Sequence, residues 1–232
     1  MSRNYLTYVN FAGIVLLCMM ALPLSMQYAY AQSQTMIPEK IEWTWEVRPD
    51  NPQPNLPNVL LVGDSITRLY YPEVTQDLAG KANVYLFSTS ASVGDPRLPA
   101  QLKEFFALEH AHFSVVHFNN GMHGWAYSEA EYKAAFPSLI KALRHDAPGA
   151  KLIWANTTPV KKDDPEWTSN ARVDARNAIA AAIVKQHHIP LDDLHALVLQ
   201  HPDMYADNIH PNKVVTSLEA QQVVAGIEKM LH

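Results

Sequence analysis

The 232-residue sequence contains a single cysteine, Cys18, which lies inside an apolar run near its start. The chain beyond that run can therefore form neither a disulfide nor a thiol-based active site. Basic residues are also sparse: 18 Lys and Arg stand against 23 Asp and Glu, scattered singly without a basic run. Since nucleic-acid binding relies on clustered Lys and Arg, we expect no nucleic-acid partner.

The first residues indicate export. Arg3 precedes an apolar run at 11–24, and Ala29-Tyr30-Ala31 then supplies the small-x-small pattern of a signal-peptidase site. We predict a signal peptide at 1–31, no integral membrane segment after its removal, and a periplasmic or secreted location. The alternative is a membrane anchor, but the run is shorter than the ~20 residues needed to span a bilayer.

Residues 32–57 are rich in Pro, Asn and Gln, and the prolines at 49, 52 and 54 prevent a helix. We expect an extended N-terminal segment. Ile41, Trp43 and Trp45 would share one face of an extended strand. That face either packs as a strap over the core or stacks on a sugar.

The remainder, 58–232, is predicted to form one α/β domain, because short apolar runs alternate with stretches of helical period and neither repeats nor low-complexity tracts occur. Strands are expected at 59–62, 84–87, 115–118 and 152–155, with a fifth short strand at 189–191. Helices are expected near 73–78, 98–108, 129–144, 170–186 and 214–230. This alternation predicts a three-layer α/β/α sandwich around a parallel sheet of about five strands.

Ligands of such sheets bind beyond the carboxyl ends of the strands. The first predicted strand leads directly into Gly63-Asp64-Ser65, which places Ser65 at that end and at the start of the next helix. A serine hydroxyl is a weak nucleophile unless a base takes its proton.

Asp207 and His210 lie three residues apart just before the last predicted helix. A carboxylate can meet an imidazole at this spacing within one turn. Asp207 would then fix the tautomer of His210, whose Nε2 would face Ser65. We predict Ser65 as nucleophile, His210 as base and Asp207 as the residue that orients the base.

GDS after the first strand together with Asp-x-x-His before the last helix resembles the outer motifs of the SGNH/GDSL hydrolase superfamily, over about residues 58–231. The resemblance implies a five-stranded parallel sheet and a serine esterase. It also implies an oxyanion hole made of the Ser65 amide, a glycine amide after the second strand and an asparagine side chain after the third.

The two middle motifs depart from that family pattern. Gly94 is our candidate for the glycine, with Ser90 or Ser92 as alternatives. The third motif reads Asn119-Asn120-Gly121 and resembles an Asn-x-Gly variant found in some polysaccharide-modifying relatives. Asn119 is the expected oxyanion donor and Asn120 the alternative, because adjacent strand residues face opposite ways.

Three further residues are candidate substrate contacts: Asp64, His123 and Trp125. His123 and Trp125 either line the pocket or pack beneath a loop. No histidine pair shows the ligand pattern of a zinc motif, so we expect neither a metal nor another cofactor.

Together these features predict an exported esterase acting on small-molecule or oligosaccharide esters, including O-acetyl groups on sugars. A lipase, a thioesterase or a transacylase would use the same chemistry. A non-catalytic carbohydrate-binding protein on the same fold is the alternative from another class.

Overall fold

The computed structural model describes residues 36–164 and 167–232, so the predicted signal peptide lies outside the described residues. A six-stranded sheet runs through this region, with the strand order β1-β3-β2-β4-β5-β6. The strands in that order are Thr44–Val47, Asn83–Thr89, Asn58–Gly63, Phe113–Phe118, Lys151–Ala155 and Leu191–Asp192. The strands β2 to β6 pair in parallel, as the sequence predicts, whereas β1 is antiparallel to β3.

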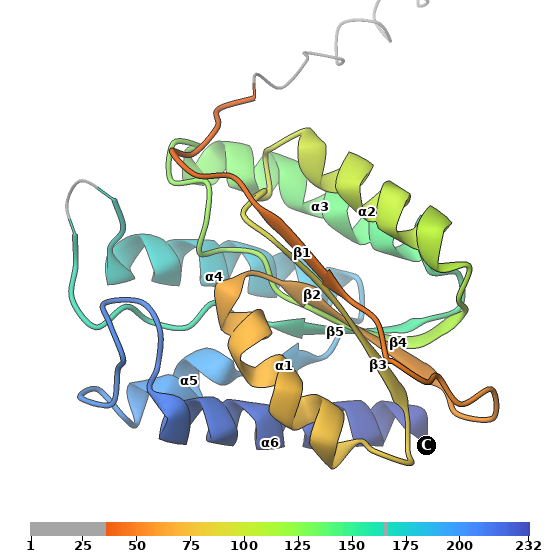
Figure 1. Cartoon of the computed structure of the whole chain (residues 1–232). Helices are drawn as coiled ribbons and strands as arrows, with labels where there is room; N and C mark the ends of the chain where they lie inside the picture. Colours follow the sequence, from red (N-terminus) through yellow and green to blue (C-terminus); the bar gives the residue numbers. More distant parts are fainter. Residues whose placement is uncertain (1–35, 165–166) are drawn as a thin grey trace, which may run out of the picture. The chain divides into compact units, whose positions relative to one another are not determined.

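Helices cover both faces of the sheet and make the three predicted layers (Figure 1). The helices α2 (Arg97–Glu109), α3 (Glu129–Asp146) and α4 (Asn170–Gln186) pack side by side on one face. The opposite face carries α1 (Ser65–Asp77), α5 (Leu194–Leu199) and α6 (Lys213–Leu231). Five of the six helices correspond to predicted ones, and the short α5 is an addition.

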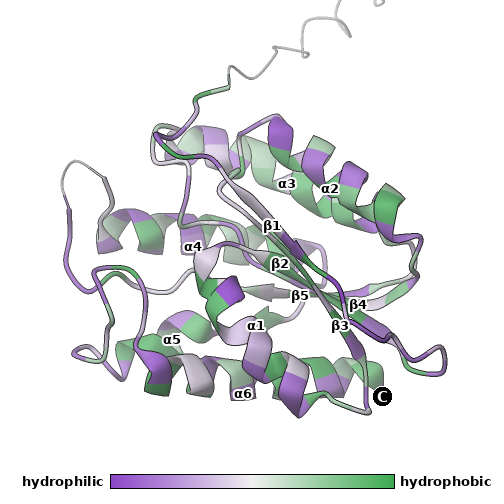
Figure 2. Cartoon of the chain, viewed as in Figure 1, coloured by the Kyte–Doolittle hydropathy of each residue, from purple (hydrophilic) through white to green (hydrophobic). Residues whose placement is uncertain are grey.

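The sheet separates two hydrophobic cores. Successive side chains of a strand point to opposite faces, and accordingly Leu60 and Val62 of β2 join one core while Val59 and Leu61 join the other. Every residue of β2 after Asn58 is buried, which explains its continuous apolar run. Figure 2 shows hydrophilic and hydrophobic residues alternating along α2 and α6, which each present only part of their surface to a core.

The helix α1 begins at Ser65, whereas its helical pattern suggested a start at 73. The Asp64 side chain accepts a hydrogen bond from the Ile66 amide at 2.9 Å and so caps the helix. Tyr70 and Val74 are buried on the same helix and hold it to the sheet. This cap and packing outweigh the interruption by Pro72, an interior residue that removes one helical hydrogen bond.

The segment before β2 contacts the domain through β1 and the residues that precede it. The Arg68 guanidinium lies 5.2 Å from the ring centroids of both Trp43 and Trp45. The two tryptophans therefore share one face, as alternation predicts, and that face meets α1. Ile41 lies outside the strand and is exposed.

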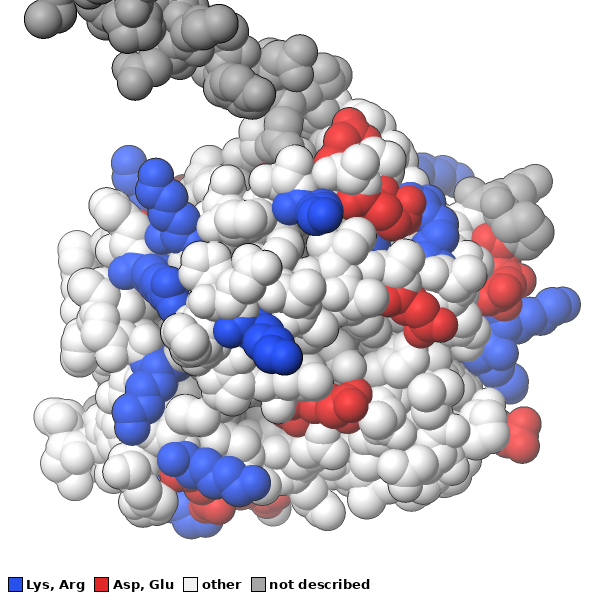
Figure 3. All heavy atoms as spheres, turned by 180° about the vertical axis from the view of Figure 1, so that it is seen from behind, with Lys and Arg blue, Asp and Glu red and all other residues white. Residues whose placement is uncertain are grey.

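No helix within the described residues is long and apolar enough to cross a membrane. Both signs of charge occur on the face shown in Figure 3, separated by wide uncharged areas.

Candidate active site

Ser65 is the first residue of α1 and follows the carboxyl end of β2 after Asp64. The turn is tight, because a Cβ on Gly63 would lie 2.0 Å from the Thr67 hydroxyl oxygen. A glycine is therefore required where the strand passes into the helix. The Ser65 amide is one of the first amides of α1, which have no acceptor within the helix. It lies at the positive end of the helix dipole.

His210 and Asp207 lie in the loop that leads into α6 and form a continuous chain with Ser65. The Ser65 hydroxyl oxygen is 2.7 Å from Nε2 of His210. On the other side of the ring, Nδ1 is 2.7 Å from an Asp207 carboxylate oxygen. The second carboxylate oxygen accepts hydrogen bonds from the amides of Ile209 at 2.7 Å and His210 at 2.8 Å. The carboxylate is thus held by its own loop.

These hydrogen bonds keep Asp207 ionised. Partial burial alone would raise the pKa of its carboxyl, but the amide of His210, the imidazole of His210 and the amide of Ile209 together lower that pKa below its ordinary value. An ionised Asp207 accepts Nδ1–H and leaves the Nε2 lone pair of a neutral His210 directed at the serine hydroxyl. This arrangement can remove the hydroxyl proton.

A cavity of about 320 Å³ lies beside Ser65, which we call the serine cavity. Its lining residues are Trp43, Ser65, Arg68, Met122, His123, Trp167, Ile209 and His210. It shares Ser65, Arg68 and His210 with a hollow of about 680 Å³ between α1 and the loop before α6. It shares three other residues, Trp43, His123 and Trp167, with a hollow of about 670 Å³ at the N-terminal segment. The serine therefore lies where two larger hollows meet.

Asn119, the expected oxyanion donor, lies directly after β4 and is buried. Its side-chain amide donates to the Ala155 carbonyl at 2.8 Å and to the Thr157 hydroxyl at 3.3 Å. The amide nitrogen is thereby engaged by β5 and the segment after it, and Asn119 is not among the residues lining the serine cavity. Its contacts join the ends of β4 and β5.

Asn120, the alternative donor, is tied to the loop after β3. Its oxygen accepts the Val93 amide at 2.7 Å and its amide donates to the Ala91 carbonyl at 2.9 Å. Gly94 of the same loop has φ +104, and a Cβ there would lie 3.2 Å from the Tyr127 ring. Neither Asn120 nor Gly94 lines the serine cavity.

Asp64, a candidate substrate contact, is buried beneath Ser65, where it caps α1. Among the described residues its second oxygen has no hydrogen-bond partner, and both carboxyl oxygens of the fully buried Glu219 lack one there as well. Burial, together with the charges of Asp64 and Asp192, raises the pKa of Glu219 to about 8. Glu219 is therefore protonated at neutral pH.

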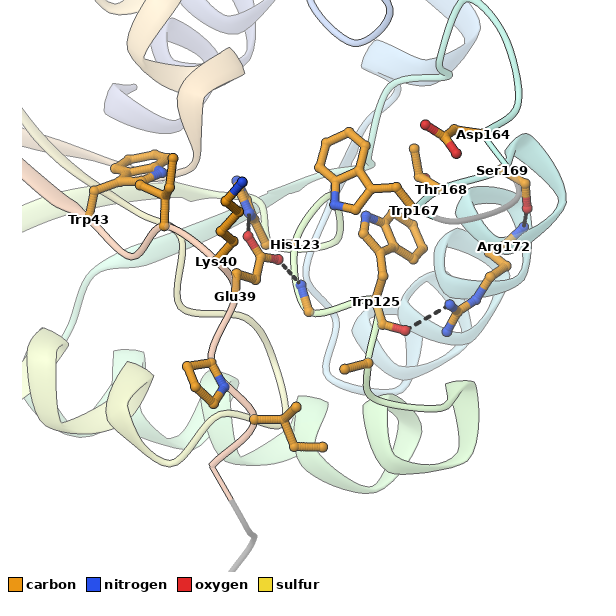
Figure 4. A pocket seen from close by; sticks show the side chains of 15 residues that line it. Glu39, Lys40, Trp43, His123, Trp125, Asp164, Trp167, Thr168, Ser169 and Arg172 are labelled. Carbon is orange, nitrogen blue, oxygen red and sulfur yellow. Dashed lines mark hydrogen bonds and ion pairs between the residues drawn. The ribbon is translucent and has the colours of Figure 1, made fainter.

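His123 lines the serine cavity, one of the two roles that we considered for it. Its Nδ1 lies 2.8 Å from a Glu39 carboxylate oxygen, and the second oxygen accepts the Gly124 amide at 2.7 Å. Figure 4 shows Glu39 reaching both groups from the N-terminal segment. The imidazole and the Trp43 ring form a T-shaped pair, with centroids 5.8 Å apart.

Trp125 lines the hollow at the N-terminal segment, but most of its surface is buried. The guanidinium of Arg176 lies 4.1 Å from its ring centroid and that of Arg172 lies 5.1 Å from it. These arginines also donate to main-chain carbonyls of the loop, including that of His123 at 2.7 Å from Arg176. The loop carrying His123 and Trp125 is thus held by α4.

Sequence reasoning did not find Glu39 or its neighbour Glu42. Glu42 accepts from the Ser90 hydroxyl at 2.7 Å and pairs with Arg97 at 2.7 Å, which fixes the N-terminal segment against the loop after β3. Glu39 and Glu42 lie three residues apart in a polar, proline-containing stretch, and no local pattern marks their distant partners. Within the described ranges, no group of three or more acidic, His or Cys side chains is arranged to hold a metal ion.

Comparison with known proteins places this geometry in a family. Residues 61–214 match the model of the GDSL-like lipase/acylhydrolase family. An acetylxylan esterase of Xylanibacter ruminicola is 29% identical over 124 residues, which cover 45% of this chain and 25% of that protein. The matched region is thus only a quarter of that esterase's length.

Solved structures share the fold at low identity. The crystal structure of an acetyl xylan esterase, AlAXEase, has a TM-score of 0.61 and 15% identity, covering 73% of this chain and 99% of that one. A lipase/acylhydrolase from Enterococcus faecalis has a TM-score of 0.62 and 18% identity, covering 75% of this chain and 96% of that one.

Proposed function

Since the chain belongs to the GDSL-like lipase/acylhydrolase family, we propose that it is an exported serine esterase that cleaves carboxylic esters with Ser65, His210 and Asp207. The observation that carries the proposal is the hydrogen-bonded chain from the Ser65 hydroxyl through His210 to Asp207, with 2.7 Å at each step between side chains. Nucleophile, base and orienting carboxylate are the parts that serine hydrolysis requires.

Each group has a defined part in the reaction. Ser65 attacks the carbonyl carbon while His210 takes the hydroxyl proton. His210 then returns that proton to the departing alcohol, and water releases the acyl group by the same steps. Asp207 stabilises the imidazolium that forms in between. The proposed chemistry requires no metal.

We further propose that the alcohol part of the substrate is a carbohydrate, as in an O-acetylated oligosaccharide. Three tryptophans, Trp43, Trp125 and Trp167, line the hollow of about 670 Å³ next to the serine cavity. Trp167 is 40% exposed, so part of its indole is available to stack on a sugar ring. The names of the two acetylxylan esterases support the same substrate class.

A fluorophosphonate probe followed by turnover assays tests the esterase. We expect the wild type to be labelled on Ser65 and to hydrolyse aryl acetates, and Ser65→Ala to do neither. The matched control is Ser217→Ala, because the Ser217 hydroxyl of α6 donates to the Lys213 carbonyl at 3.0 Å and Ser217 is not among the residues lining the cavity. A folded wild type that is neither labelled nor active would instead be the binding protein.

Trp167→Ala tests the carbohydrate. We expect KM for acetylated xylo-oligosaccharides to rise about fivefold, because stacking of a sugar ring on an indole contributes on the order of 1 kcal/mol, while KM for an aryl acetate stays nearly unchanged. Equal changes for both substrates would argue against a sugar in this hollow. Acyl preference follows from the same panel, and transfer to added alcohols distinguishes a transacylase from a hydrolase.

Export is proposed from the N-terminal pattern of Arg3, apolar run and Ala29-Tyr30-Ala31. Intact-mass measurement of protein from the periplasm or medium should give a chain that begins at Gln32. Recovery of the full-length mass from that fraction would contradict cleavage.

A further inference from the structure

Among the described residues that line the serine cavity there is no asparagine. The side-chain amides of Asn119 and Asn120 are bonded to neighbouring parts of the chain, and neither residue lines the cavity. The tetrahedral intermediate formed at Ser65 carries a negative oxygen, which needs donors beyond one main-chain amide. A donor must therefore come from another residue that lines the cavity.

His123 is such a residue. Its Nδ1 is bonded to Glu39, and the imidazole forms a T-shaped pair with the Trp43 ring, so the orientation of the imidazole is fixed. Within the described part of the chain its Nε2 has no hydrogen-bond partner. The loop that carries it is held from α4, where Arg176 donates to the His123 carbonyl. His123 therefore contributes an imidazole of fixed orientation to a cavity that is also lined by Ser65 and His210.

The surroundings of His123 favour its protonated form. Burial lowers the pKa of the imidazole, but the hydrogen bond to Glu39 and the charges of Asp64, Glu39 and Glu42 raise it above its ordinary value on balance. Cationic groups also lie around it, namely Arg68 in the serine cavity, Lys40 in the adjoining hollow and Arg176 at its carbonyl. The carboxylates outweigh these cations, because the pKa of His123 is raised on balance.

We propose that His123, held as an imidazolium by Glu39, donates its Nε2–H to the carbonyl oxygen of the ester and acts as the oxyanion donor together with the Ser65 amide. This role rests on the proposed esterase function. It makes His123 a catalytic residue and Glu39, which acts through it, a positioning residue.

The step balances without transfer of the His123 proton. As the Ser65 oxygen bonds to the carbonyl carbon, its proton passes to His210 and the C=O π pair moves onto the carbonyl oxygen, which accepts the hydrogen bond from His123. When the C=O bond re-forms, the bond to the alcohol oxygen breaks and that oxygen takes the proton from His210. His123 is unchanged at the end.

The two histidines then need opposite charge states. His210 must be neutral to accept a proton. His123 must be protonated, because a neutral ring that donates Nδ1–H to Glu39 has only a lone pair on Nε2. Hence kcat/KM should rise with pH as His210 loses its proton and fall at higher pH as His123 loses its own, which gives a bell-shaped profile.

The test compares His123→Phe, His123→Gln and Glu39→Gln with an aryl acetate as substrate. His123→Phe removes the donor and should lower kcat by about 10²–10³-fold with little change in KM. His123→Gln supplies an amide donor that does not titrate, so it should retain more activity and lose the alkaline decline. Glu39→Gln should shift the alkaline decline to lower pH, because the neutral amide no longer stabilises the imidazolium.

The matched control is His145→Gln. His145 is an exposed histidine whose Nδ1 pairs with Asp146 at 2.7 Å on the surface of α3. It should leave kcat and both limbs of the profile unchanged. Folding of each variant is checked by circular dichroism and thermal unfolding. If His123→Phe does not fold, the profiles of His123→Gln and Glu39→Gln decide.

Two results would overturn the role of His123: an alkaline decline that survives in His123→Gln, or a folded His123→Phe variant with kcat within tenfold of the wild type. Both can be seen only in an enzyme that is labelled by fluorophosphonate on Ser65. A wild type without labelling and turnover would overturn the proposed esterase function and this role with it, so the two failures are distinguishable.

Discussion

On one side of Ser65 the histidine and its carboxylate, His210 and Asp207, are three residues apart in sequence, whereas on the other side His123 and Glu39 are separated by 84. Chain connectivity alone brings the first pair together. The second pair exists only because the N-terminal segment packs against the loop after β4. The difference shows why a short sequence motif predicts the pair of His210 and Asp207 but not the pair of His123 and Glu39.

The pairs also differ in exposure. Side-chain exposure is 28% for His210 and 57% for Asp207, against 13% for His123 and 23% for Glu39. Water therefore screens the first pair more strongly than the second. A screened pair suits a histidine that gains and loses a proton in every turnover, while a less exposed pair suits one that keeps its charge.

The largest loss of turnover is expected on the motif side. His210→Ala removes the base that, among the described residues, is bonded to the Ser65 hydroxyl, so kcat should fall by about 10⁴–10⁶-fold. Steady-state kinetics with an aryl acetate measures the loss, and an unchanged thermal unfolding curve serves as the folding control. A loss below about a hundredfold would transfer the role of base to another group.

Asp207→Asn should cost less, about 10²–10⁴-fold in kcat, because solvent at this exposed carboxylate takes over part of its role. The pKa of Asp207 is lowered by its hydrogen bonds, so the carboxylate keeps its charge in the assay and the acid limb of kcat/KM reflects the need for a neutral His210. Loss of the negative charge should move that limb to lower pH and leave the alkaline limb in place. If the alkaline limb moved instead, the pairs His210–Asp207 and His123–Glu39 would not act separately.

The asparagines should affect stability more than turnover. Each makes two hydrogen bonds from a buried side chain, so Asn119→Ala and Asn120→Ala should each lower the free energy of unfolding by about 1–3 kcal/mol. We expect kcat to change less than tenfold in either variant. Urea unfolding and kinetics on the same preparations test this, and a hundredfold loss of kcat at unchanged stability would make that asparagine an oxyanion donor after all.

Glu219→Gln should leave turnover unchanged but alter how stability depends on pH. Glu219 has a pKa of about 8 in the folded chain against an ordinary 4.5. Between these values the folded state binds more protons than the unfolded state, so stability is present at low pH and is lost as pH rises, by up to about 1.4 kcal/mol per pH unit. Urea unfolding at pH 6, 7 and 8 should show a shallower decline in the variant. An identical slope in both proteins would mean that water reaches the carboxyl.

Much of the fold can be predicted from the sequence, because β2 to β5 are buried apolar runs and their period separates them from the helices. The start of α1 at Ser65 follows from the Gly63-Asp64-Ser65 motif, but the apolar period marks only 73–78, since Pro72 masks a helix whose stability comes from the Asp64 cap and from burial of Tyr70. In the site, a glycine, a serine and an Asp-x-x-His spacing lead to Ser65, Asp207 and His210.

The remaining site residues depend on distant contacts. Adjacent positions face opposite ways, which left Asn119 and Asn120 as alternatives, yet both side chains bond to neighbouring main chain and neither reaches the cavity. Glu39 lies in a polar stretch without periodicity. Glu39 meets His123 because that stretch packs against the loop after β4, and no residue spacing in the sequence predicts this contact.

The antiparallel β1 has a second consequence, which concerns association between molecules. Without it, β3 would end the sheet as a seven-residue, fully buried strand with a free row of peptide groups, a ready template for pairing with another copy. In its place stands a four-residue strand that carries Glu46 and is followed by Arg48 and Pro49. Short length, charge and proline all discourage further strand addition. The segment that brings Glu39 to His123 thus also protects the sheet from aggregation.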